Sequence, residues 1–430
     1  PGPRDADGLP DHTTLQTIRR AAAVGLYGGL SSTVPRLYRL AHYYRSIGVT
    51  TIAGGQHFAG ENIAEALDNG VDIVVLGEAD ETIREVLAAL RAQQPLDTIA
   101  GLAFRRDGQI ITTAARPPIT DFATLPLPDF HLVRYARITL FPVGWIRGCG
   151  MDCEFCTVKG APRAASVERV VEQIASLVET HDARHFFLVD DLFGHVRSET
   201  LRLCNLLAAY QSATGTMLDI AVQIRLDRAR DTELLQAMRT AGVTTVCIGF
   251  ESPIAEELAA MNKKLKPDEM LDLTQRYHRA GFHVHGMFIF GYPMPDGVQV
   301  TVSLQERIAR FKHFIKKARL DTLQLLLPVP LPGTEMTARL AAQKRILPRT
   351  LIGWEYYDGN FPLFVPDPPL TPLSMQLAIR KVMGRFYRFR SMFGVARNVI
   401  IFPAMLFPLF NLRFRWRAWY RTWRASLLRF

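Results

Sequence analysis

Three cysteines stand close together between Arg147 and Cys156: Cys149, Cys153 and Cys156 follow the spacing C-x3-C-x2-C. Three thiolates on one short loop can hold three irons of a [4Fe–4S] cube and leave the fourth iron open. A cluster that only carries electrons is normally held by four cysteines, so an open iron predicts a further ligand. The spacing therefore predicts an iron–sulfur centre that binds a small molecule.

Two other uses of these cysteines have less support. A structural zinc site needs a fourth ligand and usually a second C-x2-C or H-x3-5-H pair. The remaining cysteines, Cys204 and Cys247, stand alone in apolar stretches and are typical of small buried hydrophobic residues. A long chain with only five cysteines also disfavours a disulfide framework.

The cysteine spacing, with the aromatic Phe155 just before the last cysteine, resembles the motif of the radical S-adenosylmethionine (SAM) enzymes. The resemblance implies that the amino and carboxylate groups of SAM bind the open iron. It further implies that the reduced cluster cleaves SAM to methionine and a 5′-deoxyadenosyl radical, which takes hydrogen from an unreactive C–H bond.

The chain around this motif alternates apolar strands with helical patterns, which indicates an α/β fold. Helices are expected over about 166–181, 198–212, 230–241, 267–280 and 301–317. Six such units over 138–345 fit a partial (β/α)6 barrel resembling the radical SAM core, with the cysteine loop after the first strand. The predicted strands are 142–148, 185–190, 218–225, 243–250, 283–290 and 321–327.

Polar residues stand at or near the ends of these predicted strands, where barrel active sites lie. The resemblance implies that they bind SAM together with Phe155. The residue types alone leave other roles open: a solvated turn or helix cap for the acid pair, and a buried ion pair for the glutamine and arginine. The predicted SAM-binding residues are Asp190, Asp191, Gln223, Arg225, Gly249, Glu251 and Gly291.

Residues 1–116 are predicted to form a partial doubly wound domain, in which strands over 23–27, 49–53 and 71–76 alternate with helices over about 34–47 and 80–93. A hairpin over 101–114 turns at Asp107 and Gly108, and the proline-rich segment 117–137 is the predicted linker.

This N-terminal domain resembles the cobalamin-binding domains that precede some radical SAM cores. The resemblance implies cobalamin contacts at Ser31, Ser32, Thr33, Gly54, Gly55, Gly77 and Glu78. The usual D-x-H-x-x-G loop is missing before Ser31, so the first β-α unit is expected to be absent or degenerate. Because the chain begins at Pro1, the original N-terminus is expected to have been lost or processed. The alternative is a remnant domain kept for packing.

Residues 346–430 are predicted to form a helical C-terminal extension. Its start carries Tyr356, Tyr357 and Asp358, which with Tyr292 are predicted to face the substrate. Residues 368–430 contain twelve lysines and arginines and no acid, although the whole chain has a net charge of only +10. An acidic partner surface is therefore expected for this tail.

Residues 398–412 carry no charge, and they precede a stretch in which arginine alternates with tryptophan and tyrosine. The apolar run is too short to span a bilayer and contains two prolines. Arginines beside aromatic rings are typical of a membrane interface. A helix docked on the catalytic body and a nucleic-acid contact are the alternatives, the latter disfavoured because the apolar run has no use there.

The sequence predicts a radical SAM enzyme with a [4Fe–4S] cluster and SAM, and C-methylation of an apolar or lipid-like substrate if cobalamin binds. Without cobalamin, a rearrangement, cyclisation or oxidation is expected; a non-catalytic metal-binding protein at a membrane is a different class. The expected electron donor is a flavodoxin or ferredoxin. The expected location is the cytoplasm, peripheral on the inner membrane face, because an oxygen-sensitive cluster favours a reducing compartment.

The tail prediction can be tested by flotation with liposomes of anionic lipid. The full chain is expected to float with the liposomes and a chain lacking residues 398–430 to stay in the lower fractions, because headgroup attraction and apolar burial are both lost. Neutral liposomes serve as the control and should capture less protein. Equal flotation of the two chains would contradict a membrane role for the tail.

Overall fold

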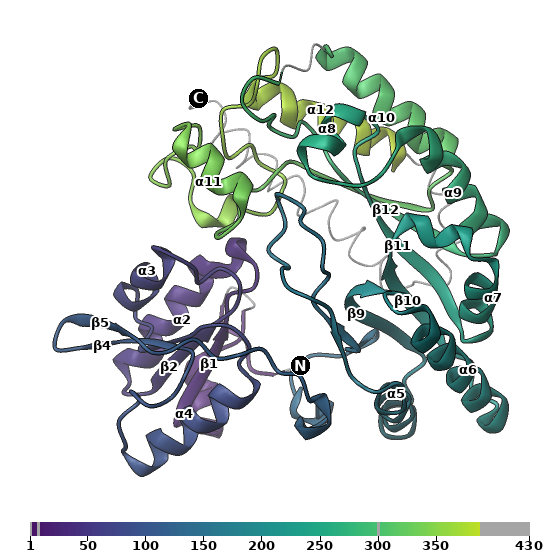
Figure 1. Cartoon of the computed structure of the whole chain (residues 1–430). Helices are drawn as coiled ribbons and strands as arrows, with labels where there is room; N and C mark the ends of the chain where they lie inside the picture. The colour runs from purple at the N-terminus through teal and green to yellow at the C-terminus, as the bar shows by residue number, and fades with distance from the viewer. Residues whose placement is uncertain (1, 7–8, 299–301, 388–430) are drawn as a thin grey trace.

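The computed structural model describes residues 2–6, 9–298 and 302–387, which form two main β-sheets and a small two-stranded one (Figure 1). The predicted membrane segment 398–430 lies outside these residues. Within the described ranges, no helix has both the length and the apolar character needed to cross a membrane.

The N-terminal sheet has five strands in sequential order, of which the first three are parallel and the last two form an antiparallel hairpin. Asp107 and Gly108 turn this hairpin, both with positive φ, as predicted. The antiparallel pairing of β4 with β3 makes the sheet mixed. Its strands are β1 (Ala23–Tyr27), β2 (Thr50–Gly54), β3 (Ile73–Val75), β4 (Leu102–Arg106) and β5 (Gln109–Thr112).

Helices cover both faces of this sheet, which confirms the partial doubly wound prediction. Ala53 and Val74 pack with α2 (Val34–Ser46) and α3 (Asn62–Asp68), whereas Ile52 and Ile73 pack with α4 (Asp80–Ala92). Neighbouring residues of one strand enter different cores because successive side chains point to opposite faces. A short helix, α1 (His12–Ile18), and a 3-10 turn, η1 (Ser31–Thr33), complete this part of the chain.

The second main sheet is the partial barrel that the sequence predicts. Its six strands lie in the order β13-β12-β11-β10-β9-β6, and every neighbouring pair is parallel. The helices cover its outer side (Figure 1). The strands are β6 (Phe141–Val143), β9 (His185–Phe193), β10 (Asp219–Ile224), β11 (Val243–Glu251), β12 (His283–Ile289) and β13 (Thr322–Leu326). The helices are α5 (Val167–His181), α6 (Arg197–Thr214), α7 (Thr232–Thr240), α8 (Ala255–Ala260), α9 (Pro267–Arg279) and α10 (Leu304–Ala318), with the 3-10 turn η4 (Leu226–Arg230).

The first barrel strand is shorter than predicted. The sheet pairing of 142–148 ends at Val143, and β7 (Ile146–Arg147) pairs instead with β8 (Arg163–Ala164). The carboxylate of Asp190 accepts the N–H groups of Trp145 and Ile146, so these donors no longer need a neighbouring strand. The cysteine loop therefore leaves from a separate two-stranded ribbon.

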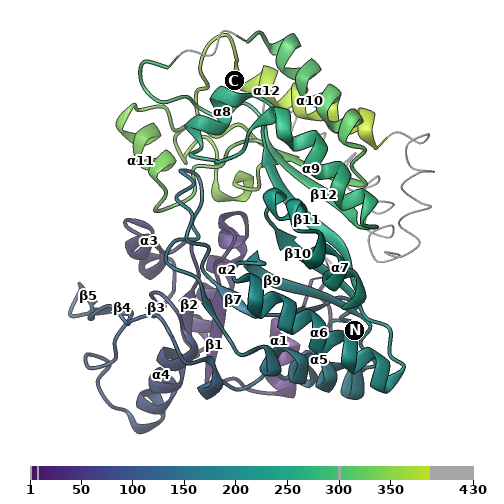
Figure 2. The same cartoon turned by 45° about the vertical axis from the view of Figure 1, so that its right-hand side comes forward.

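The C-terminal elements close the molecule on two sides. Helix α12 (Pro372–Phe386) lies beside α10 in both views (Figures 1 and 2). Helix α11 (Glu335–Ala342) follows β13, and the turn η5 (Trp354–Tyr356) packs against the N-terminal domain. Trp354 and Tyr357 share one core with Leu37 and Leu67. Two further 3-10 turns, η2 (Phe122–Thr124) and η3 (Phe130–Leu132), lie in the linker.

Gly55 allows two strand-end loops of the N-terminal domain to meet. Its φ is +122°, and a Cβ atom there would lie 2.6 Å from the carbonyl carbon of Gly28. We expect Gly55→Ala to lower the free energy of unfolding by about 3 kcal/mol through strain and overlap. Gly60→Ala is the matched control, with a positive φ but no heavy atom within 4 Å of the added Cβ, and should cost about 1 kcal/mol.

Urea unfolding followed by circular dichroism measures both variants. Equal midpoints for Gly55→Ala and Gly60→Ala would show that the close approach to Gly28 does not constrain the fold.

Candidate active site

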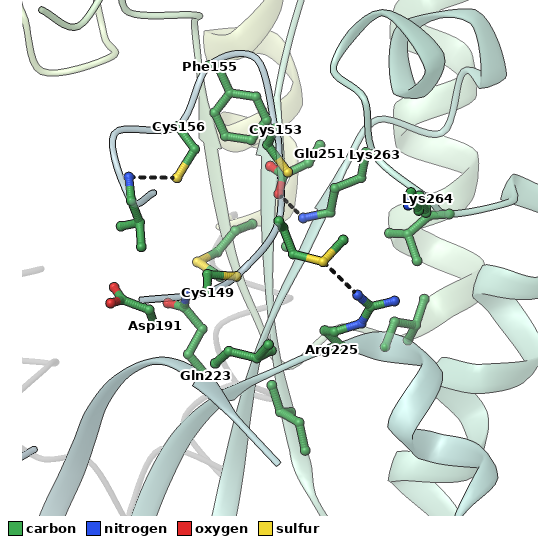
Figure 3. A pocket seen from close by; sticks show the side chains of 18 residues that line it. Cys149, Cys153, Phe155, Cys156, Asp191, Gln223, Arg225, Glu251, Lys263 and Lys264 are labelled. Carbon is green, nitrogen blue, oxygen red and sulfur yellow. Dashed lines mark hydrogen bonds and ion pairs between the residues drawn. The ribbon is translucent and has the colours of Figure 1, made fainter. Parts of the chain in front are cut away.

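The three cysteine thiols line one pocket at the C-terminal ends of the barrel strands (Figure 3). Gly148 and Gly150 flank the first cysteine with φ of +86° and +68°, and a Cβ at Gly148 would lie 2.9 Å from the carbonyl oxygen of Ala161. These glycines allow the chain to turn sharply out of β7. The pocket is lined by Cys149, Met151, Cys153, Phe155, Cys156, Val158, Asp191, Leu192, Gln223, Ile224, Arg225, Leu226, Gly249, Glu251, Lys263, Lys264, Leu265 and Met287.

The donor set fits an iron–sulfur cluster with an open iron. Three thiols share the pocket, whereas Cys204 lies buried in α6 and Cys247 does not line it. In the described part of the chain, no three histidine, cysteine or acidic residues are grouped to hold a single metal ion. A cube distributes its thiolates over separate irons, so they need not converge on one point.

One cation, Lys263, acts against the effect of burial on two of the thiols. Burial raises the pKa of Cys149 and Cys153, and the Lys263 ammonium acts in the opposite direction on both. For Cys153, Lys263 exerts the largest influence of any charged group. The thiolate is the form that binds iron, so a nearby cation supports it.

The cysteine loop is fixed by Glu154, which the sequence reasoning missed. Its carboxylate receives a two-pronged contact from Arg339, with Nε–Oε1 and Nη2–Oε2 distances of 2.7 and 3.0 Å, and a hydrogen bond of 2.5 Å from the Tyr292 hydroxyl. Its backbone carbonyl accepts from the N–H of Met336. An acid between two cluster ligands is the only signal for this role in the sequence.

Asp190 and Asp191 face different ways. Asp190 is buried outside the pocket, and its Oδ1 accepts the N–H groups of Trp145 and Ile146, both at 2.8 Å. Burial raises the pKa of Asp190 to about 7, and Asp191 adds to this. Asp191 lines the pocket and accepts from the N–H of Gly148 at 2.8 Å. The predicted SAM contact of Asp190 is therefore replaced by a structural role.

Gln223 and Arg225 lie in the pocket, as their predicted role requires. Arg225 is held by Asp227, with Nε–Oδ1 and Nη2–Oδ2 distances of 3.1 and 2.6 Å, and its Nη1 lies 3.1 Å from the sulfur of Met151. Arg225 therefore forms an ion pair, which is one of the roles that the residue types left open. It also lines the pocket.

Glu251 ends β11 in the left-handed region, with φ of +60°. Its carboxylate accepts from Lys263 Nζ at 2.8 Å. A Cβ at Gly249 would lie 2.4 Å from Glu251 Oε1, so the glycine makes room for the pair. Burial lowers the pKa of Lys263, but Glu251 outweighs it, and the pKa lies above the ordinary lysine value.

Gly291 does not reach this pocket. Its φ is +73°, and a Cβ there would lie 2.7 Å from the terminal methyl of Met375 in α12. The predicted SAM contact at this position is therefore a packing contact with the C-terminal helix.

The N-terminal domain contacts both the cysteine loop and the two-stranded ribbon that flanks it. Thr157, directly after the last cysteine, donates its hydroxyl to Gln56 Oε1 at 2.8 Å. Arg147 contacts Asp80 through two hydrogen bonds of 2.8 and 3.0 Å, and Arg163 binds Glu78 at 2.5 Å.

The predicted cobalamin residues divide into two groups. The Ser31 side chain is buried, and its hydroxyl lies 3.0 Å from His57 Nδ1. The Thr33 hydroxyl donates to the carbonyl of Leu30. Burial raises the pKa of Glu78, but the contact with Arg163 outweighs this and keeps the pKa below the ordinary value. These three already have protein partners, and Glu78 forms an ion pair with Arg163 of the small ribbon. The others remain at the strand ends: Ser32, Gly54, Gly55 and Gly77.

The residues predicted to face the substrate do not line the pocket. Tyr292 is buried and donates to Glu154, so it positions the cysteine loop. Tyr357 packs on Trp354, Tyr356 packs on Phe361, and Asp358 accepts hydrogen bonds from Asn360. All four have structural contacts: the partner of Tyr292 lies 138 residues away, whereas those of Tyr356, Tyr357 and Asp358 lie in the same short segment. The pocket instead contains Lys263, Lys264 and Met287, which sequence reasoning missed.

Comparison with known proteins agrees with this geometry. Residues 143–300 match the radical SAM superfamily, so this part of the chain is a radical SAM domain, with a [4Fe–4S] cluster and SAM as cofactors. The chain is 25% identical to an uncharacterized methyltransferase of Pyrococcus horikoshii, over 74% of this chain and 67% of that protein. It is 26% identical to the hopanoid C-2 methylase of Rhodopseudomonas palustris, over 55% of this chain and 44% of that protein.

Two solved structures share the fold. One is TsrM of Kitasatospora setae, a radical SAM methyltransferase solved with cobalamin and a [4Fe–4S] cluster. It matches with a TM-score of 0.63 and 16% identity, over 77% of this chain and 68% of that one. The cobalamin-dependent enzyme OxsB matches with a TM-score of 0.56 and 16% identity, over 76% of this chain and 47% of that one. The chain spans 44% to 67% of the two curated relatives described.

The anchoring of the loop predicts the effect of Glu154→Gln. Arg339 would lose its charge partner in a largely buried position, which typically costs about 3 kcal/mol or more. We expect less than about half of the wild-type iron and sulfide per chain after anaerobic reconstitution, because a loosened loop no longer holds three thiolates together. Glu335→Gln is the control: this exposed side chain lies 3.6 Å from Lys159, and its loss should leave cluster content unchanged.

Proposed function

We propose that this radical SAM enzyme is a cobalamin-dependent C-methyltransferase acting on an apolar or lipid-like substrate. The contact of Gln56 with Thr157 carries the proposal, since it joins the glycine-rich strand end of the N-terminal domain to the cysteine loop. A methyl carrier at these strand ends would lie on the same side of the molecule as the cluster. The names of the curated relatives, several of them methyltransferases, support the same chemistry.

Cys149, Cys153 and Cys156 would hold the [4Fe–4S] cluster, which would supply the electron for reductive cleavage of SAM to methionine and a 5′-deoxyadenosyl radical that abstracts hydrogen. The side chains of this chain bind and orient SAM. Asp191 and Glu251 place carboxylates where an ammonium group can bind, and Gln223 and Arg225 offer donors to its carboxylate or ribose. The apolar walls formed by Leu226 and Met287 exclude water from the radical.

The strand ends of the N-terminal sheet fit cobalamin. No heavy atom of the described residues lies within 4 Å of a Cβ built on Gly77, which leaves open space beside that backbone. Tyr27 and Leu30, at the end of β1, are 79% and 66% exposed and offer apolar surface. His57 is fully buried, and its Nε2 has no hydrogen-bond partner among the described residues. Burial and Arg349 lower its pKa to about 4, so it remains neutral. Bound cobalamin would supply a methyl group to a substrate carbon.

The inner face of the barrel supports an apolar substrate. Val189 on β9 is 47% exposed although it lies in a central strand. On β12, Val284 and Phe288 are buried in the core, whereas Met287 lines the pocket and Ile289 shares its face. Large apolar side chains left partly open inside a barrel favour contact with an apolar ligand.

A second candidate is a cobalamin-independent rearrangement, cyclisation or oxidation. It is favoured by the use of Ser31, Thr33 and Glu78 in protein contacts, which leaves fewer groups for cobalamin. Three of the curated relatives are named as magnesium-protoporphyrin IX monomethyl ester cyclases. In either case we propose a flavodoxin or ferredoxin as electron donor and a peripheral membrane contact through residues 398–430.

The proposal is tested by anaerobic reconstitution with SAM, cobalamin and a reductant. We expect 5′-deoxyadenosine from the wild type, and a cobalamin absorbance band that stays with the protein through gel filtration. Cys153→Ala should abolish 5′-deoxyadenosine but retain cobalamin, because the two cofactors are held by different elements. Cys204→Ala, the control for a cysteine outside the pocket, should keep both.

The outcomes separate the candidates. Formation of 5′-deoxyadenosine without retained cobalamin would favour the second candidate over methylation. No 5′-deoxyadenosine from a protein with an intact cluster would indicate a non-catalytic metal-binding protein.

A further inference from the structure

Lys263 is a charged group of the pocket to which the proposed reaction assigns no role. It lies in the loop after α8, its side chain is 23% exposed, and it shares the pocket with all three thiols (Figure 3). Its neighbour Lys264 also lines the pocket but is exposed, and no ion pair joins it to the described residues. The two lysines therefore differ in burial and in partners at the same site.

The loop that carries Lys263 is fastened to the cysteine loop. Asn262 donates its side-chain amide to the carbonyl of Asp152 at 2.9 Å, and the N–H of Glu154 donates to the carbonyl of Met261 at 3.2 Å. The contacts join the two residues that flank Cys153 to the two residues that precede Lys263. The lysine is thereby kept at a fixed place relative to the cluster ligands.

The ammonium group is also fixed from the barrel side. Glu251 accepts from Lys263 Nζ at 2.8 Å, and it does so from a left-handed backbone conformation that disfavours side chains. A Cβ at Gly249 would lie 3.1 Å from Nζ and 2.4 Å from the carboxylate. The left-handed backbone of Glu251 and the absence of a side chain at Gly249 therefore both allow this ion pair to form.

A fixed charge beside a cluster acts on its reduction. Adding one electron makes the cluster more negative, so a nearby cation stabilises the reduced form and a nearby carboxylate destabilises it. The apolar side chains of Ile224, Leu226 and Leu265 surround this site and weaken the screening by water.

We propose that Lys263 raises the reduction potential of the [4Fe–4S] cluster and that Glu251 holds the lysine in place and offsets part of its effect. The pair is a tuning device for electron entry, distinct from the three ligands themselves. The proposal depends on the cluster and not on cobalamin, the substrate or methyl transfer.

The test is an anaerobic potentiometric titration of the reconstituted full chain, without SAM, followed by electron paramagnetic resonance of the reduced cluster. Lys263→Met should shift the potential to more negative values, and Glu251→Gln should shift it to more positive values. Lys263→Arg keeps the charge and should stay close to the wild type. Lys264→Met is the matched control, and its exposed charge should shift the potential least.

Iron and sulfide are counted for every variant, so that a change in potential is compared only between chains with full clusters. An unchanged potential in Lys263→Met, or an equal shift in Lys264→Met, would overturn the proposal. If Lys263→Met does not hold a cluster, the decision falls on Glu251→Gln, where an unchanged or more negative potential overturns it. Retention of cobalamin, measured on the same samples, reports on the methyltransferase proposal independently.

Discussion

The ion pair between Glu154 and Arg339 is the contact on which the active site depends most. Cluster ligands act together only if their loop has one conformation, and a loop rich in glycine does not hold itself. Glu154 lies inside the cysteine run, while its partner comes 185 residues later on α11. The pair is mostly shielded from water, so its loss would leave an unpaired charge rather than a solvated one. The C-terminal half of the chain thereby fixes the loop that carries the three cysteines.

The other flank of the loop is fixed by the N-terminal domain. Arg147 and Arg163 lie on the two-stranded ribbon that flanks the cysteines. Arg147 binds Asp80, the first residue of α4, and Arg163 binds Glu78, two residues earlier. A domain that resembles cobalamin-binding domains is thus fastened to the loop that generates the radical. For a reaction that joins a methyl group to a radical, this attachment is useful, since two reactants held in fixed positions react far faster than free ones.

Much of the barrel was predictable because its signals are local. Each strand is an apolar run, each helix has its own periodicity, and parallel strands joined by helices fall into one order. Cys149, Cys153 and Cys156 needed no tertiary information, because all three lie on one loop. The acid pair after β9 shows the limit. Asp190 and Asp191 are neighbours in sequence, but alternation along the strand sends one toward the backbone of β7 and the other into the pocket.

The sequence by itself indicated a cluster with an open iron, the succession of strands and helices, and the edge of the barrel at which chemistry occurs, since these follow from spacing and periodicity along one segment; SAM followed from the resemblance to radical SAM enzymes. The tertiary structure alone decided which polar side chains reach that edge. Tyr292 and Glu78, both predicted to contact ligands, bind Glu154 and Arg163 in the structure. Lys263 gave no signal in the sequence and lies among the thiols. A buried polar group takes whatever partner the fold brings near it, and that partner can be hundreds of residues away.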